Sequence, residues 1–501
     1  MTHTWPDRLD ELAAMHPDAE ALRAVGSAPL SLTWAALSRR SAGVTQLLAR
    51  CGVTAGSTVV IELPNGGAHV LATIAAWRLG ATVLPFRPGL PAPERSRLLD
   101  LARPSLVVVP TGSTAGTVTV AEVLEAAPVE PGTVEATVAD PAWLLASGGS
   151  TGSPKLIAPP ITTAIGSAGM GLGSSGRVNT ALPDGADHRH PTYLVVGPLS
   201  HMQSFGTLHR TLLDDYRIVV MERFETEAVL DLVESEKVSL LTMVPTMLLR
   251  LLRSPTIGRR DLSHLERVFH GGAACPEWVT RAWIELVGGE RFVLGYGMSE
   301  GIGTALIRGD EWLEHPGSVG KPLNCETLIV NENGEPVARG ETGEIYFHPS
   351  QPGQVFRYVG NDSVRELDGH FFSVGDLGWL DDDGYLYIAD RRTDMIVSGG
   401  ANVFTAEVEA AVLSHPGVED AVVLGLSEPE WGQRVHAVVE PRHDAPQLNL
   451  ATLQEHCRAQ LAEFKVPRSL EIVDSIPRNE AGKVNRRALV EAREATDAGM
   501  S

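Results

Sequence analysis

The stretch SGGSTGSPK, residues Ser147 to Lys155, is compatible with three kinds of protein. Its central segment fits G-x-S-x-G, the nucleophile elbow of a serine hydrolase with Ser150 as the nucleophile. The whole stretch also approximates the phosphate loop of a P-loop NTPase. A third possibility is a glycine-rich loop that holds a nucleotide polyphosphate in another α/β fold.

The residues that follow the loop argue against a serine hydrolase and against a P-loop NTPase. A nucleophile elbow leads into a helix, but Pro159-Pro160 prevent a helix from continuing there. A P-loop needs Lys directly after its second glycine, whereas Ser153 and Pro154 intervene before Lys155. A phosphate-holding loop remains, and a plain Gly/Ser surface turn is equally compatible with the stretch taken alone.

Composition indicates a soluble globular protein with more than one domain. The chain has 501 residues, of which 43% are hydrophobic and 21% charged. Its net charge of −21 argues against nucleic acid and anionic membranes as partners. Four separated cysteines, an acidic N-terminus and the absence of a long apolar stretch predict a cytoplasmic protein.

The order of apolar segments predicts an α/β fold. Short apolar strands such as STVVIELP, YRIVVME and RFVLGYG alternate with helical segments, as in parallel sheets covered by helices. Glycine-punctuated strands follow from about residue 322, and a smaller α+β unit follows Arg391. We therefore expect a large N-terminal domain of layered βα subdomains plus a β-rich subdomain, residues 1–390. A small mobile C-terminal domain, residues 391–501, would follow a hinge near 391–394.

Three further motifs follow the glycine loop in a fixed order: GYGMSE at 295–300, GDLGWLDDDGYLYIADRRTD at 375–394 and PRNEAGKVNRR at 477–487. Together the four resemble those of the adenylate-forming ANL superfamily, which includes acyl- and aryl-CoA synthetases, nonribosomal peptide adenylation domains and luciferases. The resemblance spans residues 25–490. It implies that ATP and Mg²⁺ are used to activate a carboxylic acid as acyl-AMP, with release of pyrophosphate.

The resemblance also implies roles for individual residues, although Asp376 alone would suit a turn and Lys483 alone a solvated charge. Lys483 would be the catalytic lysine that bridges the acid and the α-phosphate, and Glu300 would bind Mg²⁺. Phosphate contacts are expected from Ser147, Ser150, Thr151, Gly152, Lys155 and Ser299. Adenine contacts are expected from Gly272, Ala273 and Tyr296, and ribose contacts from Asp376 and Arg391. Thr393 stands at the hinge position, where relatives usually carry Asp or Lys.

The acid pocket is expected beside His201, which matches a gating position of the superfamily. Its walls would include Met202, Phe205, Gly271, Gly295, Gly297, Met298 and Ile302. These segments contain small and apolar residues and no basic one, which favours a flat, apolar acid of the aryl or heteroaryl type over a diacid.

The acyl acceptor is the least constrained part of the function. The chain resembles the stand-alone amide bond synthetases of the superfamily, such as the one that acts on β-carboline acids, so we expect a small-molecule amine. Coenzyme A is the alternative, because Trp431 matches a position that stacks on its adenine in some CoA ligases. Arg434, Lys465 and Arg468 would then meet phosphates.

Two other patterns are interpreted as loops. The run Asp187-His188-Arg189-His190 has metal-ligating side chains, but no further ligand is spaced nearby in the sequence. Residues 171–176 (GLGSSG) match G-x-G-x-x-G, yet no strand precedes them and no acidic residue follows at the required distance.

Overall fold

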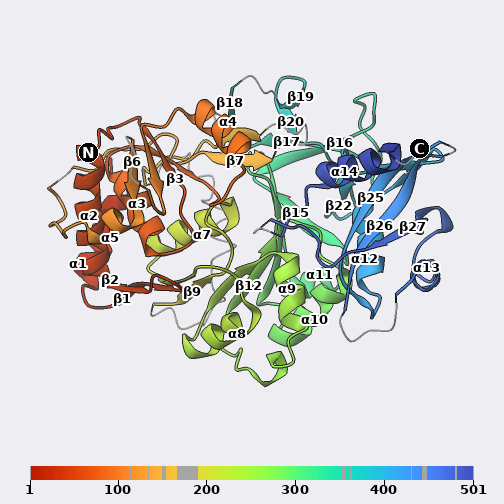
Figure 1. The fold of residues 1–501 in the computed structure, drawn as a ribbon, viewed down its shortest axis with the longest axis horizontal. Coiled ribbons are helices and arrows are strands. Elements are labelled where there is room, and N and C mark those ends of the chain that lie inside the picture. Colours follow the sequence, from red (N-terminus) through yellow and green to blue (C-terminus); the bar gives the residue numbers. More distant parts are fainter. Residues whose placement is uncertain are drawn as a thin grey trace.

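A computed structural model gives the structure of the chain, which has a large N-terminal domain and a small C-terminal domain (Figure 1). The predicted α/β class and the division into a large and a small domain are confirmed. The residues described are 2–112, 116–133, 135–148, 154–165, 190–350, 356–360, 364–429, 431–442, 448–479 and 482–499.

Six adjacent parallel strands form one part of the largest sheet, which has 15 strands. Their spatial order and bounds are β1 (Glu20–Val25), β10 (Arg217–Met221), β9 (Thr192–Val195), β11 (Leu240–Met243), β12 (Arg267–Gly271) and β13 (Phe292–Gly297). Every residue of β9, β11 and β12 is buried, so both faces of the sheet are covered. The connecting helices are α7 (Met202–Leu213), α8 (Thr226–Ser235), α9 (Pro245–Leu252) and α10 (Glu277–Val287).

Antiparallel strands extend the same sheet beyond β13. They include the β-rich region expected from about residue 322, whereas its continuity with the parallel strands was not predicted. Their order and bounds are β14 (Thr304–Arg308), β15 (Ser318–Leu323), β22 (Leu386–Arg391), β21 (Asp376–Leu380), β17 (Gly343–Pro349), β20 (Phe371–Ser373) and β19 (Arg365–Leu367), with β16 (Cys325–Val330) beside β17.

The N-terminal part of the chain packs helices against a second, four-stranded parallel sheet. The sheet contains β4 (Thr82–Pro85), β3 (Thr58–Ile61), β5 (Leu106–Val109) and β6 (Thr117–Thr119), and the helices are α1 (Trp5–Met15), α2 (Trp34–Arg50), α3 (Gly67–Arg78), α4 (Ala92–Ala102) and α5 (Val120–Glu125). Every residue of α3 is buried, including Arg78, which binds Asp10 of α1 at 2.7 Å. Among the described residues, no helix has the length and apolar character that crossing a membrane requires.

The glycine loop joins two strands of a small antiparallel sheet. Strand β7 (Leu145–Gly148) pairs with β8 (Pro154–Ala158), which in turn pairs with β18 (Arg357–Val359). Residues 149–153 lie outside the described part of the chain. Since a strand follows the loop where a nucleophile elbow requires a helix, the structure contradicts a hydrolase elbow at Ser150.

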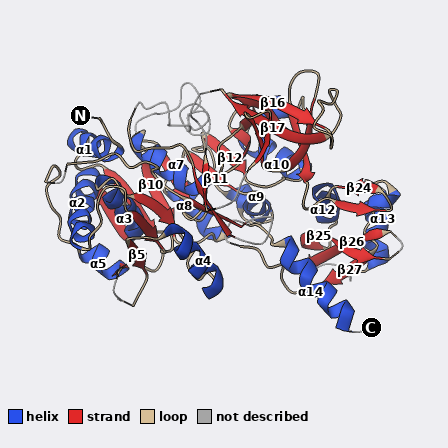
Figure 2. Ribbon diagram, turned by 90° about the horizontal axis from the view of Figure 1, so that it is seen from above, coloured by secondary structure: helices blue, strands red, loops and turns tan. Residues whose placement is uncertain are grey.

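The C-terminal domain has a sheet and a core of its own, beside the large sheet (Figure 2). Its elements are β23 (Ile396–Ser398), β24 (Ala401–Val403), α12 (Thr405–Leu413), β25 (Val418–Glu428), β26 (Gly432–Pro441), α13 (Leu450–Arg458), β27 (Ser469–Ile472) and α14 (Arg486–Gly499). Thr405 is the first residue of α12. Its amide and hydroxyl both donate to Asp390 at the end of β22, at 2.5 and 2.9 Å.

Candidate active site

The predicted motifs meet at the carboxyl edge of the parallel strands. His201 follows β9, Thr246 follows β11, Gly272 follows β12 and Ser299 follows β13. Because β9, β11, β12 and β13 are adjacent and parallel, these residues lie along one edge of the sheet. This edge is where open α/β sheets bind their ligands.

A buried carboxylate, Asp376, connects two of the predicted nucleotide-binding residues. Asp376 begins β21 and is 5% exposed, and its partner in the adjacent strand β22 is Arg391. The Nε of Arg391 lies 3.3 Å from Oδ1 of Asp376, and the hydroxyl of Tyr296 donates to Oδ2 at 2.6 Å. Burial raises the pKa of Tyr296 well above its usual value, and the Asp376 charge raises it further. The phenol therefore stays neutral and serves as a donor.

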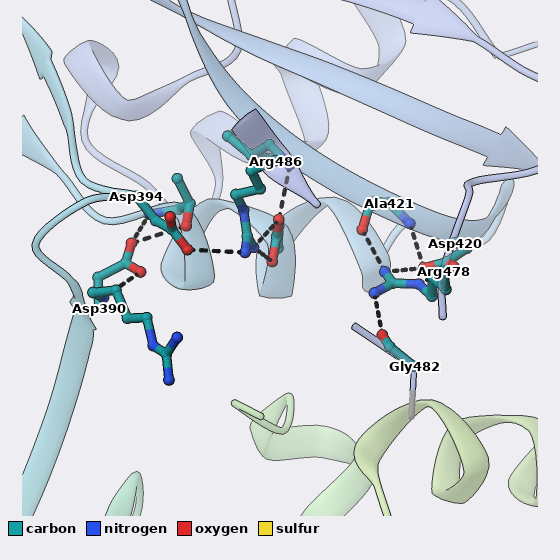
Figure 3. A network of polar contacts seen from close by, with 11 residues as sticks. Asp390, Asp394, Asp420, Ala421, Arg478, Gly482 and Arg486 are labelled. Carbon is teal, nitrogen blue, oxygen red and sulfur yellow. Dashed lines mark hydrogen bonds and ion pairs between the residues drawn. The ribbon is translucent and has the colours of Figure 1, made fainter. Parts of the chain in front are cut away.

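The loop with Lys483 reaches this edge of the sheet from the C-terminal domain. The loop that carries it is held by Arg478, which donates to the carbonyl of Gly482 at 2.9 Å and pairs with Asp420 at 2.6 Å (Figure 3). The backbone of Asn479 donates to the carbonyl of Lys483 at 2.8 Å, which closes the turn. Gly482 packs against Thr246 and Val244, at the carboxyl end of β11. The two domains are thus in contact at this loop.

Three other predicted site residues affect the pKa of Lys483 through their charges. Its pKa is lowered, first by desolvation and then by the Arg391 charge, while Asp376 and Glu300 oppose the shift. Lys483 is exposed to solvent, yet enough protein surrounds its ammonium group to desolvate it in part. Lys483, Arg391, Asp376 and Glu300 therefore belong to one electrostatic cluster.

His201 lies at the same edge of the sheet, as the residue that precedes α7. Desolvation lowers its pKa to about 4, with smaller contributions from Lys483 and Arg87. The imidazole is therefore neutral at physiological pH. Within the described part of the chain its Nε2 is buried without a hydrogen-bond partner.

Glu300 is linked to the strand that follows the glycine loop through Tyr358. The Tyr358 hydroxyl donates to Oε1 of Glu300 at 2.9 Å, and the Lys155 ammonium lies 4.9 Å from the centre of the Tyr358 ring. Ser147 pairs with Lys155 in the β7–β8 ladder, whereas Ser150, Thr151 and Gly152 lie outside the described residues. Sequence analysis missed Tyr358, because no motif surrounds it, and also missed Arg87.

The remaining predicted nucleotide-binding residues lie at the same edge. Gly272 and Ala273 are exposed in the turn after β12, and Ser299 is half-buried in the turn after β13. Gly272 has φ +84°, and a Cβ built on it would be in ordinary van der Waals contact with Gln203 and Val244, at 3.7 and 3.8 Å. The positive φ, and not a lack of space, therefore favours glycine at this point.

Two predicted pocket residues are corrected by the structure. Phe205 is 0% exposed among Trp77, Trp143 and His209, and Ile302 is 1% exposed in the core of the β-rich region. Neither side chain faces a cleft. Met202 and Met298 are half-buried at the edge of these cores, and Gly297 is exposed at the end of β13.

Gly271 and Gly295 serve the packing of the sheet. A Cβ on Gly271 would lie 2.8 Å from the carbonyl oxygen of Gly295, and one on Gly295 would lie 2.5 Å from the Phe269 ring. Real Cβ atoms keep more than 3.0 Å from such neighbours. These two glycines let β12 and β13 approach each other, which brings their carboxyl ends together.

Thr393 is exposed between the two domains, and its hydroxyl donates to the neighbouring Asp394 at 3.3 Å. Asp394 pairs with Arg486, which also binds Glu409 of α12 at 2.7 Å (Figure 3). Where relatives usually carry Asp or Lys, this chain has Thr393. A carboxylate follows at the next residue, Asp394, and its ion pair with Arg486 ties it to the C-terminal domain.

Comparison with known proteins identifies the class. A family model described as AMP-binding enzyme matches residues 9–357, and one described as AMP-binding enzyme C-terminal domain matches residues 407–483. The chain belongs to the AMP-binding family, within the ANL superfamily of adenylate-forming enzymes. It is an ATP-dependent adenylate-forming ligase, as the sequence motifs predicted.

Several relatives match over nearly the whole chain. A feruloyl-CoA synthase of an Amycolatopsis species is 34% identical over 506 residues, which covers 96% of both proteins. A 2-succinylbenzoate–CoA ligase of Bacillus licheniformis is 30% identical and covers 97% of this chain and 99% of its own. The structure of o-succinylbenzoate CoA synthetase (MenE) from Bacillus subtilis, in complex with its acyl-adenylate intermediate, aligns with a TM-score of 0.82 at 27% identity and 98% coverage of both chains.

Proposed function

We propose that this enzyme is an aryl-CoA ligase that forms AMP. The convergence of Lys483, Asp376, Arg391 and Glu300 in one cleft supports the adenylation step. The full-length relatives described above are named for CoA thioester formation, which supports coenzyme A as the acceptor. They favour a thioester with coenzyme A over the amide product that the sequence resemblance had suggested.

In the first half-reaction, a carboxylate oxygen of the acid forms a bond to the α-phosphorus of ATP, and the bond to pyrophosphate breaks. The difficulty is the approach of one anion to another, so fixed positive charge stabilises the transition state. Lys483 supplies that charge, since it lies within electrostatic reach of Asp376 and Arg391. Asp376 would accept the ribose hydroxyls, with Arg391 beside it and adenine between Tyr296 and the Gly272-Ala273 turn.

The residues present fit a magnesium ion at Glu300. Magnesium is usually held by one or two carboxylates together with substrate phosphates. Glu300 is half-buried at the end of β13, and within the described chain its carboxylate forms no salt bridge. The ion would offset phosphate charge there, while Ser299, Lys155 and the glycine loop would hold the phosphates themselves.

The acid would lie beside neutral His201 and Met202. The exposed small residues Gly272, Ala273 and Gly297 at this edge of the sheet suit a flat ring. Arg87 stands within electrostatic reach of His201, so a polar substituent on the acid has a basic group available. An aryl acid is therefore proposed, with the substituent to be determined.

In the second half-reaction, the thiol sulfur would attack the acyl carbon and AMP would leave. Trp431 is 40% exposed on the C-terminal domain, and the Arg468 guanidinium lies 4.4 Å from its ring centre. An exposed aromatic ring with a cation over it suits an adenine and its phosphates. Arg434 and Lys465, by contrast, already pair with Glu428 and Glu407.

A product assay tests this proposal. Aryl and aliphatic acids, including one diacid, are offered with ATP, magnesium, coenzyme A and a primary amine, and products are identified by mass spectrometry. A thioester that the wild-type enzyme forms and Lys483→Ala does not form supports the proposal. Lysine-dependent amide without thioester refutes the CoA assignment but keeps adenylation, and acid turnover without ATP refutes both.

A further inference from the structure

Two histidines and an aspartate from three distant parts of the chain meet at the amino-terminal edge of the parallel sheet. His16 follows α1, His190 precedes β9, and Asp215 lies in the turn between α7 and β10. One potential ligand atom of each lies within 4.8 Å of those of the other two. The cleft is at the opposite, carboxyl edge of β9 and β10, so this cluster is separate from the active site.

The distances in the cluster match those between ligands of one metal ion. Nε2 of His16 lies 3.4 Å from Oδ2 of Asp215, and Nδ1 of His190 lies 3.4 Å from Oδ1. Two atoms bound tetrahedrally to zinc at ~2.0–2.1 Å are roughly 3.3–3.4 Å apart. Each imidazole is thus placed as if it shared a cation with the carboxylate.

Two atoms of the cluster also need a partner. Nδ1 of His190 and Oδ1 of Asp215 are buried, and among the described residues neither forms a hydrogen bond, although they face each other. A buried polar atom without a partner costs about 1–3 kcal/mol. Because a cation accepts a lone pair from both atoms at once, it would satisfy them together.

We propose that His16, His190 and Asp215 bind a divalent transition metal, with zinc as the best match. Imidazole nitrogen and carboxylate oxygen are its usual ligands, whereas magnesium prefers oxygen alone. The ion joins the end of α1 to the start of β9 and to the α7–β10 turn, so its role is to stabilise the fold. The sequence alone suggested a loop at His190, because its co-ligands are close only in space.

Cobalt and zinc titration of the untagged, chelator-treated full-length enzyme tests this site. We expect one equivalent of cobalt with a visible absorption band, its displacement by zinc, and a higher melting temperature with zinc. Asp215→Asn preserves the shape of the side chain and tolerates the positive φ of 65°, and His16→Gln removes a second ligand. Each should weaken zinc binding at least about tenfold. His264→Gln, at an exposed histidine elsewhere, should not.

Acid-dependent pyrophosphate exchange at the wild-type rate shows that the variants are folded, because the site lies away from the cleft. Wild-type enzyme that binds no cobalt equivalent, or binds it equally well after Asp215→Asn and His16→Gln, overturns the proposal. The wild-type titration decides even if a variant fails to fold.

Discussion

Substitution of Gly482 by alanine should slow adenylation and leave the rate of the second half-reaction almost unchanged. Gly482 has φ +72° and lies against α9 in the domain arrangement that brings Lys483 into the cleft. A Cβ built there would overlap Oγ1 of Thr246 and would lie 3.4 Å from Cγ2 of Val244. The substitution Gly482→Ala therefore opposes this arrangement without touching a reacting group.

Two contributions must be separated to obtain the size of the effect. Placing Ala at a positive φ destabilises the loop by about 1–2 kcal/mol, and it does so whether or not the loop is docked against α9. Overpacking against Thr246 costs about 1–3 kcal/mol, and only while the loop is docked. Only the overpacking distinguishes the docked arrangement from the undocked one, so it corresponds to a loss of roughly 5-fold to 160-fold in adenylation, at 1.36 kcal/mol for each factor of ten.

Acid-dependent ATP–pyrophosphate exchange measures adenylation, and consumption of separately prepared acyl-AMP measures the second step. The exchange rate should fall, while the second step changes little. In Gly482→Ala/Thr246→Ala the overlap is relieved, so the exchange rate should recover in part. Wild-type exchange by Gly482→Ala, or a double variant no faster than the single one, would refute the reasoning.

Three other outcomes are expected. Activity should be lost as pH rises through the lowered pKa of Lys483, so the alkaline limb of the kcat/KM profile should lie below the usual lysine range. Lys483→Arg should move this limb to higher pH, and a limb that Lys483→Arg leaves in place would show that the lysine does not have this role. Asp376→Asn should raise the KM for ATP about 10- to 100-fold, since hydrogen bonds to a charged group contribute ~1.5–3 kcal/mol; an unchanged KM would place ribose binding elsewhere. Asp10→Ala leaves the Arg78 guanidinium, 2% exposed, without its carboxylate and should lower the free energy of unfolding in urea by about 3–5 kcal/mol. The exposed pair Arg308–Asp310 is its control, where Asp310→Ala should cost no more than about 1 kcal/mol.

Much of the fold could be predicted because it depends on local patterns. The apolar segments STVVIELP, YRIVVME and RFVLGYG became the parallel strands β3, β10 and β13. Pro159-Pro160 correctly excluded a helix after the glycine loop. The start of α12 shows the limit of such patterns, because the amide and hydroxyl of Thr405 donate to Asp390, a carboxylate that belongs to β22.

The sequence by itself indicated the class of chemistry, because four motifs in order resemble those of one family. The same resemblance indicated Asp376, Glu300 and Lys483, whose proposed roles depend on charge. Only the tertiary structure decided which side chains face the cleft. Phe205 and Ile302 are buried in hydrophobic cores, whereas Tyr358 donates a hydrogen bond to Glu300 and the Arg87 charge helps to lower the pKa of His201. The same holds for His16, His190 and Asp215, because the topology of the sheet decides which distant residues become neighbours.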